Sequence, residues 1–92
     1  MQLRDKTILI TGGTSGIGRA LVDLLAPANR AVMVIAKDSQ KLEALRAEYV
    51  NVHVYACALE SQDAVQQTIN TVLNQHPDIR VVINNAAIQN TP

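Results

Sequence analysis

Short apolar segments alternate with amphipathic segments along the chain, and this alternation constrains the fold more than any other feature. Residues 7–11 (TILIT) and 31–36 (AVMVIA) are almost entirely apolar and rich in β-branched side chains, which is typical of strands buried on both faces. Residues 51–57 (NVHVYAC) and 81–83 (VVI) predict a third and a fourth strand. Buried strands joined by helices form parallel sheets that are covered on both sides.

The three segments between these strands have the residue spacing of amphipathic helices. Asp38 or Ser39 can cap the second helix, and Ser61 can cap the third. The residues expected on the buried faces, in chain order, are Ile17, Ala20, Leu21, Leu24, Leu25, Leu42, Leu45, Tyr49, Val65, Ile69, Val72 and Leu73.

The resulting element order is βαβαβαβ, which predicts an α/β fold with a doubly wound, Rossmann-like parallel sheet. Right-handed crossovers limit the topology, and the doubly wound solution has strand order 3-2-1-4. The first two helices would then cover one face of the sheet and the third helix the other. A ligand crevice is expected between the first and fourth strands, where the direction of winding changes.

Composition excludes several classes of function. Eight basic and eight acidic residues cancel, and no basic stripe suggests nucleic acid or an anionic membrane surface as a partner. No segment approaches the roughly 18 apolar residues of a membrane helix, and the start is not a signal peptide. A single cysteine, Cys57, excludes an internal disulfide and favours a reducing compartment, so we expect a cytoplasmic protein.

A glycine-rich loop, TGGTSGIG, spans Thr11 to Gly18 between the first strand and the first helix. Glycines let the backbone approach a phosphate closely, and the start of a helix presents free N–H groups to it. A P-loop would require lysine and a hydroxyl residue after the final glycine, where Arg19 and Ala20 stand instead.

The G-x-G-x-x-G dinucleotide pattern is not matched either, because Thr14 occupies the position of its second glycine. What remains is G-x-x-x-G-x-G, formed by Gly12, Gly16 and Gly18. A glycine turn that binds nothing is the alternative interpretation.

This spacing resembles the short-chain dehydrogenase/reductase family, whose loop has the form T-G-x-x-x-G-I-G. The N-N-A-G motif that follows the family's fourth strand is approximated by residues 84–87 (NNAA), at a fitting distance. The resemblance spans residues 1–92, but only the N-terminal dinucleotide-binding portion of a typical member. It implies an NAD(P)-dependent oxidoreductase that transfers hydride between carbonyl and alcohol. The cofactor-binding residues that it implies are Gly12, Thr14, Ser15, Gly16, Ile17, Gly18, Lys37, Asn84 and Ala86.

The resemblance places the choice of cofactor at the end of the second strand. Ala36 ends that strand and Lys37 follows, and a lysine there can pair with a 2′-phosphate, which favours NADP over NAD. Asp38 lies about 20 residues beyond the loop, the spacing of a ribose-binding acid, but is better placed as a helix cap. Lys37 as an ordinary solvated loop charge is the alternative.

Two departures from the family predict weak binding. Ala58 stands where the family usually has an aspartate for the adenine amino group, and the loss of one such hydrogen bond lowers affinity by about three- to tenfold. Ala87 replaces the glycine of N-N-A-G.

The family's catalytic Ser, Tyr and Lys would all lie beyond Pro92, and the chain has no Tyr-x-x-x-Lys. We therefore expect a truncated chain without a catalytic site or a metal. A stand-alone nucleotide-binding module and a folded remnant that self-associates are the alternatives. The fourth strand, internal in the family, would here be an exposed apolar edge, so we expect a homo-oligomer, through that edge or the third helix's face.

Overall fold

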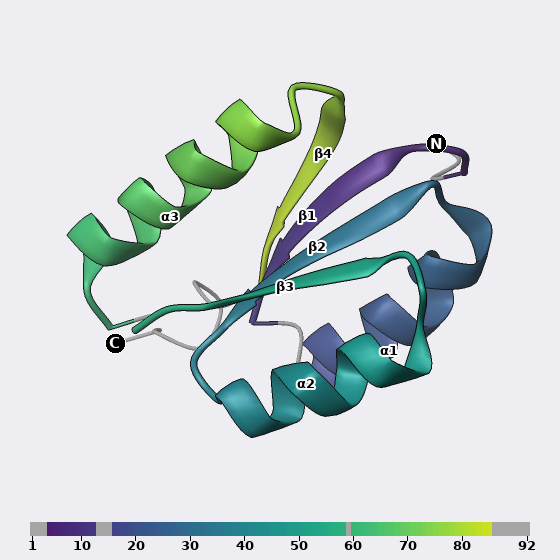
Figure 1. Cartoon of the computed structure of the whole chain (residues 1–92), viewed down its shortest axis with the longest axis horizontal. Coiled ribbons are helices and arrows are strands. Elements are labelled where there is room, and N and C mark those ends of the chain that lie inside the picture. The colour runs from purple at the N-terminus through teal and green to yellow at the C-terminus, as the bar shows by residue number, and fades with distance from the viewer. Residues whose placement is uncertain (1–3, 13–15, 59, 86–92) are drawn as a thin grey trace.

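The computed structural model describes residues 4–12, 16–58 and 60–85. Within these residues, four strands alternate with three α-helices and one short 3-10 turn (Figure 1). The elements are β1 (Thr7–Thr11), α1 (Gly16–Leu25), η1 (Ala26–Ala28), β2 (Ala31–Ala36), α2 (Ser39–Glu48), β3 (Val52–Ala56), α3 (Gln62–Gln75) and β4 (Ile79–Asn84). The predicted element order is confirmed, and β4 is longer at both ends than the three residues expected.

The four strands form one parallel sheet in the order β3-β2-β1-β4, as the doubly wound topology predicts. Thr11 is in register with Ile35 of β2 and with Asn84 of β4. The carboxyl ends of these three strands therefore meet at one edge of the sheet, where ligands of open α/β sheets bind.

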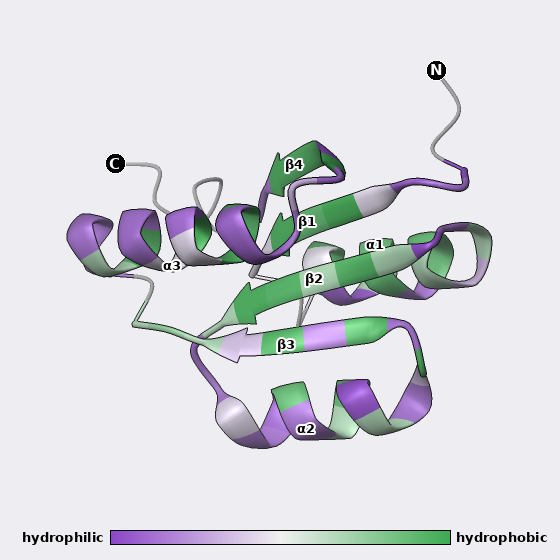
Figure 2. Ribbon diagram, turned by 45° about the horizontal axis from the view of Figure 1, so that its top comes forward, coloured by the Kyte–Doolittle hydropathy of each residue, from purple (hydrophilic) through white to green (hydrophobic). Residues whose placement is uncertain are grey.

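Each face of the sheet carries its own layer of helices (Figures 1 and 2). On one face, strand residues such as Ile8 and Val34 pack against Val22 of α1 and Leu45 of α2. On the other face, Leu9, Met33 and Ile35 pack with Val72 of α3. The central strands β1 and β2 are thus buried from both sides, which explains their continuous apolar sequence.

The buried stripe of α1 differs from the one expected. Val22 is fully buried, whereas Ile17 and Leu24 are 68% and 70% exposed. Ala20 is exposed as well, whereas Leu25 is buried and Leu21 packs partly buried against the core, as expected. The fully buried stripe runs through Gly18, Val22 and Leu25, because the glycine lets the start of the helix approach the sheet closely. Hydrophobic spacing alone assigns too little weight to a glycine, which has no side chain to bury.

The expected helix caps are present. The Asp38 carboxylate accepts hydrogen bonds from the backbone N–H groups of Gln40 and Lys41, and the Ser61 hydroxyl accepts one from Ala64. These side chains satisfy donors that a helix start leaves without partners. Both helices therefore begin where the sequence predicts.

The two edges of the sheet are β3 and β4. Val82 of β4 is 50% exposed. At the amino end of the β1–β4 pair, the Thr7 hydroxyl donates to the Asp78 carboxylate at 2.7 Å, which lowers the pKa of Asp78 below its usual value. Among the described residues, no helix is long and apolar enough to span a membrane.

Candidate functional site

Side chains and backbone groups tie the carboxyl ends of β1, β2 and β4 together. The Thr11 hydroxyl donates to Asn84 Oδ1 at 2.7 Å. The backbone N–H of Gly12 donates to the Ile35 carbonyl at 2.6 Å. Asn84 of β4 thus bonds to β1, and Gly12 at the end of β1 bonds to β2.

A clasp of three residues, Gly12, Gly18 and Asn85, joins the glycine loop to the end of β4. Asn85 is 3% exposed, and its Nδ2 donates to the Gly12 carbonyl at 3.0 Å. A Cβ added to Gly18 would collide with that carbonyl oxygen and lie 2.7 Å from Asn85 Nδ2. Only glycine therefore allows the first turn of α1 to lie against the clasp.

Gly12 and Gly16 are required for a different reason, which is the conformation of their backbone. Gly12 has φ of 77° and Gly16 has φ of 58°, in the left-handed region that other L-residues rarely adopt. A Cβ at Gly16 would meet nothing within 4 Å. Space next to the backbone at Gly16 is therefore available to a ligand.

The start of α1 has the electrostatic properties of an anion-binding site. The first backbone N–H groups of a helix have no partner within it, and the helix dipole adds partial positive charge there. The first turn of α1 contains no acidic residue that would compete with an incoming anion. A phosphate group placed here would thus meet oriented donors and no opposing carboxylate.

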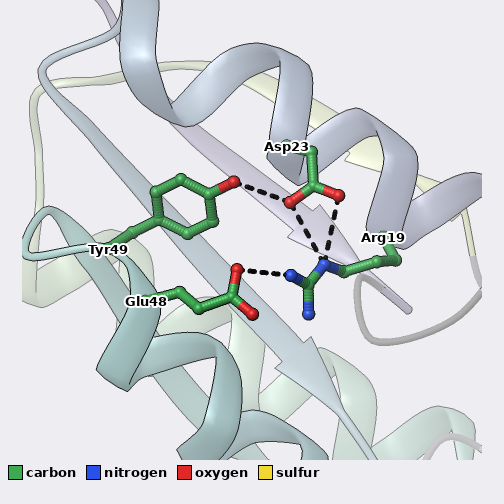
Figure 3. A network of polar contacts seen from close by, with 4 residues as sticks. All are labelled: Arg19, Asp23, Glu48 and Tyr49. Carbon is green, nitrogen blue, oxygen red and sulfur yellow. Dashed lines mark hydrogen bonds and ion pairs between the residues drawn. The ribbon is translucent and has the colours of Figure 1, made fainter.

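A surface network fixes α1 against the end of α2 (Figure 3). Arg19 Nε donates to both Asp23 carboxylate oxygens at 3.2 and 3.3 Å, and its guanidinium also contacts Glu48 at 2.6 Å. The Tyr49 hydroxyl donates to Asp23 at 2.7 Å. That hydrogen bond, together with Arg19, lowers the pKa of Asp23, and it raises the pKa of Tyr49.

Three charged residues lie at the carboxyl ends of β2 and β3. Lys37 Nζ lies 3.6 Å from Glu60 Oε1, and both side chains are largely exposed, at 71% and 65%. Asp38 is the cap of α2, as described above. Ala58, at the position expected for adenine recognition, is also exposed.

The structure brings some of the predicted binding residues together and not others. Gly12, Gly18 and Asn84 belong to one group, and Gly16 and Ile17 are exposed beside it at the start of α1. Lys37 follows the neighbouring strand β2. The remaining predicted residues Thr14, Ser15 and Ala86 lie outside the described residues.

Sequence reasoning assigned no role of its own to Asn85, which it named only as part of the motif at residues 84–87. The available signal was its place directly after Asn84. Adjacent residues at the end of a strand point to opposite sides, so when Asn84 bonds to Thr11, the next asparagine is directed elsewhere. Here it reaches the Gly12 carbonyl.

The histidines lie far along the chain from the glycine loop and have local partners. Their rings are 5.5 Å apart between centroids, and His76 Nε2 lies 3.1 Å from the Tyr55 hydroxyl. In the part of the chain that the structure describes, no three His, Cys, Asp or Glu residues form a group that could hold a metal ion.

Comparisons with known proteins agree with this geometry. The sequence model of the short chain dehydrogenase family matches residues 6–92. An uncharacterized oxidoreductase of Mycobacterium bovis is 35% identical over 91% of this chain, and the chain spans 27% of that protein's length. The 3-oxoacyl-[acyl-carrier-protein] reductase FabG of Aquifex aeolicus is 29% identical over 96% of the chain, which spans 38% of that protein.

A solved structure shows the same arrangement of elements. The citronellol catabolism dehydrogenase of Pseudomonas aeruginosa matches 86% of this chain with a TM-score of 0.76 and 30% identity. The matched region is 35% of that protein. The chain therefore spans about a third of the length of the relatives that it matches.

Proposed function

Because the chain belongs to the short-chain dehydrogenase family, we propose that its 92 residues bind the dinucleotide cofactor of an NAD(P)-dependent oxidoreductase. The relatives are named as oxidoreductases, reductases or dehydrogenases, and this supports hydride transfer between a carbonyl and an alcohol as the reaction of the whole protein. The cofactor supplies the hydride chemistry; this chain's residues bind and orient it.

The observation that carries this proposal is the clasp of Gly12, Gly18 and Asn85. The buried Asn85 amide donates to the Gly12 carbonyl, and Gly18, where a Cβ would collide with that carbonyl, lets the start of α1 lie next to it. The space at Gly16 and the absence of acid in the first turn of α1 suit a pyrophosphate. The residues present therefore fit the cofactor that the family implies.

Proton transfer is not assigned to these residues. Family members use a tyrosine whose pKa is lowered by a lysine four positions later, but here His53 and Leu59 stand four positions after the two tyrosines. The hydroxyls of Tyr49 and Tyr55 have local partners, and the pKa of each is raised rather than lowered. We propose that the chain by itself binds the cofactor weakly and does not catalyse the reaction.

We further propose that Lys37 favours NADP over NAD. Its ammonium group is exposed at the carboxyl end of β2, where it can pair with a 2′-phosphate. Asp38, the competing candidate for the ribose hydroxyls, already accepts two hydrogen bonds from the start of α2.

Titration of the chain with NADPH and NADH, followed by backbone amide NMR shifts, tests both proposals. We expect NADPH to shift the amides of Gly12, Gly16 and Gly18, and Lys37→Ala to weaken NADPH binding by about threefold to tenfold, as for an exposed charge-assisted contact. NADH binding should change by less than about twofold. Absence of shifts at the glycine loop with either cofactor would refute the proposed function, and unchanged NADPH affinity in Lys37→Ala would refute the role of the lysine alone.

Self-association is a second proposed property, because β4 presents an apolar edge. Within the described residues β4 pairs only with β1, and Val82 is half exposed on it. Unpaired edge strands associate with one another, and a two-fold dimer is the simplest closed arrangement.

Light scattering at about 100 μM protein should therefore give the mass of a dimer, with dissociation on dilution. We expect Val82→Lys to weaken the dimer by about tenfold, since an edge lysine opposes strand pairing. Val50→Lys is the matched control, because Val50 is fully exposed in the turn between α2 and β3. A monodisperse monomer in the unmodified chain would contradict the proposal.

A further inference from the structure

The carboxyl ends of β2 and β3 bring an acidic side chain next to the residue proposed to bind the 2′-phosphate. Ala36 and Ala56 are in register, and the backbone N–H of Cys57 donates to the Ala36 carbonyl at 2.9 Å. The two chain segments therefore leave the sheet side by side, and Glu60 Oε1 comes within 3.6 Å of Lys37 Nζ.

The net charge at the carboxyl ends of β2 and β3 attracts a phosphate less strongly than Lys37 alone would. Lys37 contributes one positive charge, while Asp38 and Glu60 contribute two negative charges. The Asp38 carboxylate is directed to the start of α2, where it serves as a cap. The Glu60 carboxylate has no such helix contact in the described structure and pairs with Lys37.

We propose that Glu60 is a specificity-determining residue that holds Lys37 and opposes the 2′-phosphate, so that it narrows the chain's preference for NADPH over NADH. This inference rests on the proposed function. An incoming phosphate competes with the carboxylate for Lys37, and its negative charge is repelled by that carboxylate. NADH carries a hydroxyl instead of this phosphate, and a carboxylate can accept a hydrogen bond from a hydroxyl.

The variant Glu60→Gln removes the charge and keeps the size of the side chain. We expect it to tighten NADPH binding by about twofold to fivefold, the range for exposed charge pairs, and to leave NADH binding unchanged or weaker. The gain should shrink between about 20 mM and 300 mM salt, because salt screens exposed charges. In the Lys37→Ala background, Glu60→Gln should tighten NADPH binding by a smaller factor, because Glu60 then has no lysine to pair with.

Glu43→Gln is the matched control. It removes the same charge from an exposed glutamate on α2, whose carboxylate contacts Arg46 at 2.8 Å. This control should leave the ratio of NADPH to NADH affinity unchanged. Fold stability of all these variants, followed by urea unfolding, should match the unmodified chain because the altered side chains are exposed.

The outcomes separate the two proposals. If the unmodified chain binds NADPH and Glu60→Gln has the same affinity, or if both cofactors gain equally, the role of Glu60 is refuted and the proposed function stands. If neither cofactor binds to the unmodified chain or to any variant, the proposed function fails and this inference fails with it.

Discussion

Gly18→Ala is expected to destabilise the fold and to reduce dinucleotide binding by at least about tenfold, although the change adds a single methyl group. Two effects oppose each other. Alanine favours helix over glycine by up to about 1 kcal/mol, whereas overpacking a close contact costs typically about 1–3 kcal/mol. The overpacking prevails, because the new Cβ would collide with the backbone carbonyl of Gly12 rather than with a movable side chain.

Binding suffers more than stability because the start of α1 must move to relieve the collision. That movement displaces the N–H groups proposed to contact the pyrophosphate and breaks the contact between Asn85 Nδ2 and the Gly12 carbonyl. Urea unfolding and an NADPH titration measure the two effects. Ala20→Ser, which also adds one heavy atom but on the exposed side of α1, should retain binding. A Gly18→Ala chain with unchanged stability and affinity would show that the clasp is not required.

The architecture could be predicted because each of its causes is local in the sequence. Continuous apolar runs at residues 7–11 and 31–36 require burial from both sides, and the caps at Asp38 and Ser61 mark where two helices begin. Right-handed crossovers then leave few ways to order the strands. The observed order β3-β2-β1-β4 follows from these constraints.

The packing of α1 could not be predicted in the same way. Spacing favoured Ile17 and Leu24 for the buried stripe, yet both are exposed and Gly18 faces the sheet. A prediction from hydrophobic spacing considers only apolar side chains. In α1, the residue without a side chain, Gly18, lies closest to Gly12 and Asn85. The relevant information lies in residues about 70 positions apart, since Asn85 and Gly12 define the surface that Gly18 must fit.

The pairing of Lys37 with Glu60 was also outside the reach of sequence reasoning. The residues lie 23 positions apart, and their proximity depends on the register of β2 with β3. The sequence identified Lys37 as a candidate for phosphate binding but did not indicate that Glu60 lies beside it. The register of β2 with β3 brings Glu60 there, and this lowers the effect expected of the lysine on phosphate binding.

Asn85→Asp is expected to make the stability of the fold depend on pH in a way that the unmodified chain does not. The Asn85 amide donates to the Gly12 carbonyl from a position that is 3% exposed. A carboxylate cannot donate, so at pH 7 two acceptors would face each other and the free energy of unfolding should fall by about 1–3 kcal/mol. A protonated carboxyl can donate, which restores the contact.

The direction of the pH effect follows from this difference. Burial and the lack of a donor raise the folded-state pKa of the introduced carboxyl above its unfolded value of about 3.9. The folded variant therefore binds more protons than the unfolded variant between these two pKa values. Its deficit in stability should be small below the unfolded pKa and should reach its full size above the folded pKa.

Each measurement must be compared with the unmodified chain at the same pH, because other groups titrate too. The lowered pKa values of Asp23 and Asp78 mean that their stabilising contacts are present above the usual aspartate pKa and are lost as pH falls through the folded values. Both chains share this loss in acid. The difference between them, from urea unfolding at several pH values, then reports on residue 85 alone.

Asn84→Asp is the matched control, because it makes the same chemical change one residue earlier. Asn84 accepts a hydrogen bond from the Thr11 hydroxyl, and a carboxylate can accept that bond equally well. Asn84 is also exposed, whereas Asn85 is buried, so a negative charge at residue 84 should cost less stability at pH 7 than one at residue 85. A similar loss at pH 7 in both variants would mean that added charge at the end of β4 is responsible, and the proposed donor role of Asn85 would be wrong. Loss of stability in Asn85→Asp alone, recovered in acid, would establish that the Asn85 amide stabilises the fold by donating to the Gly12 carbonyl.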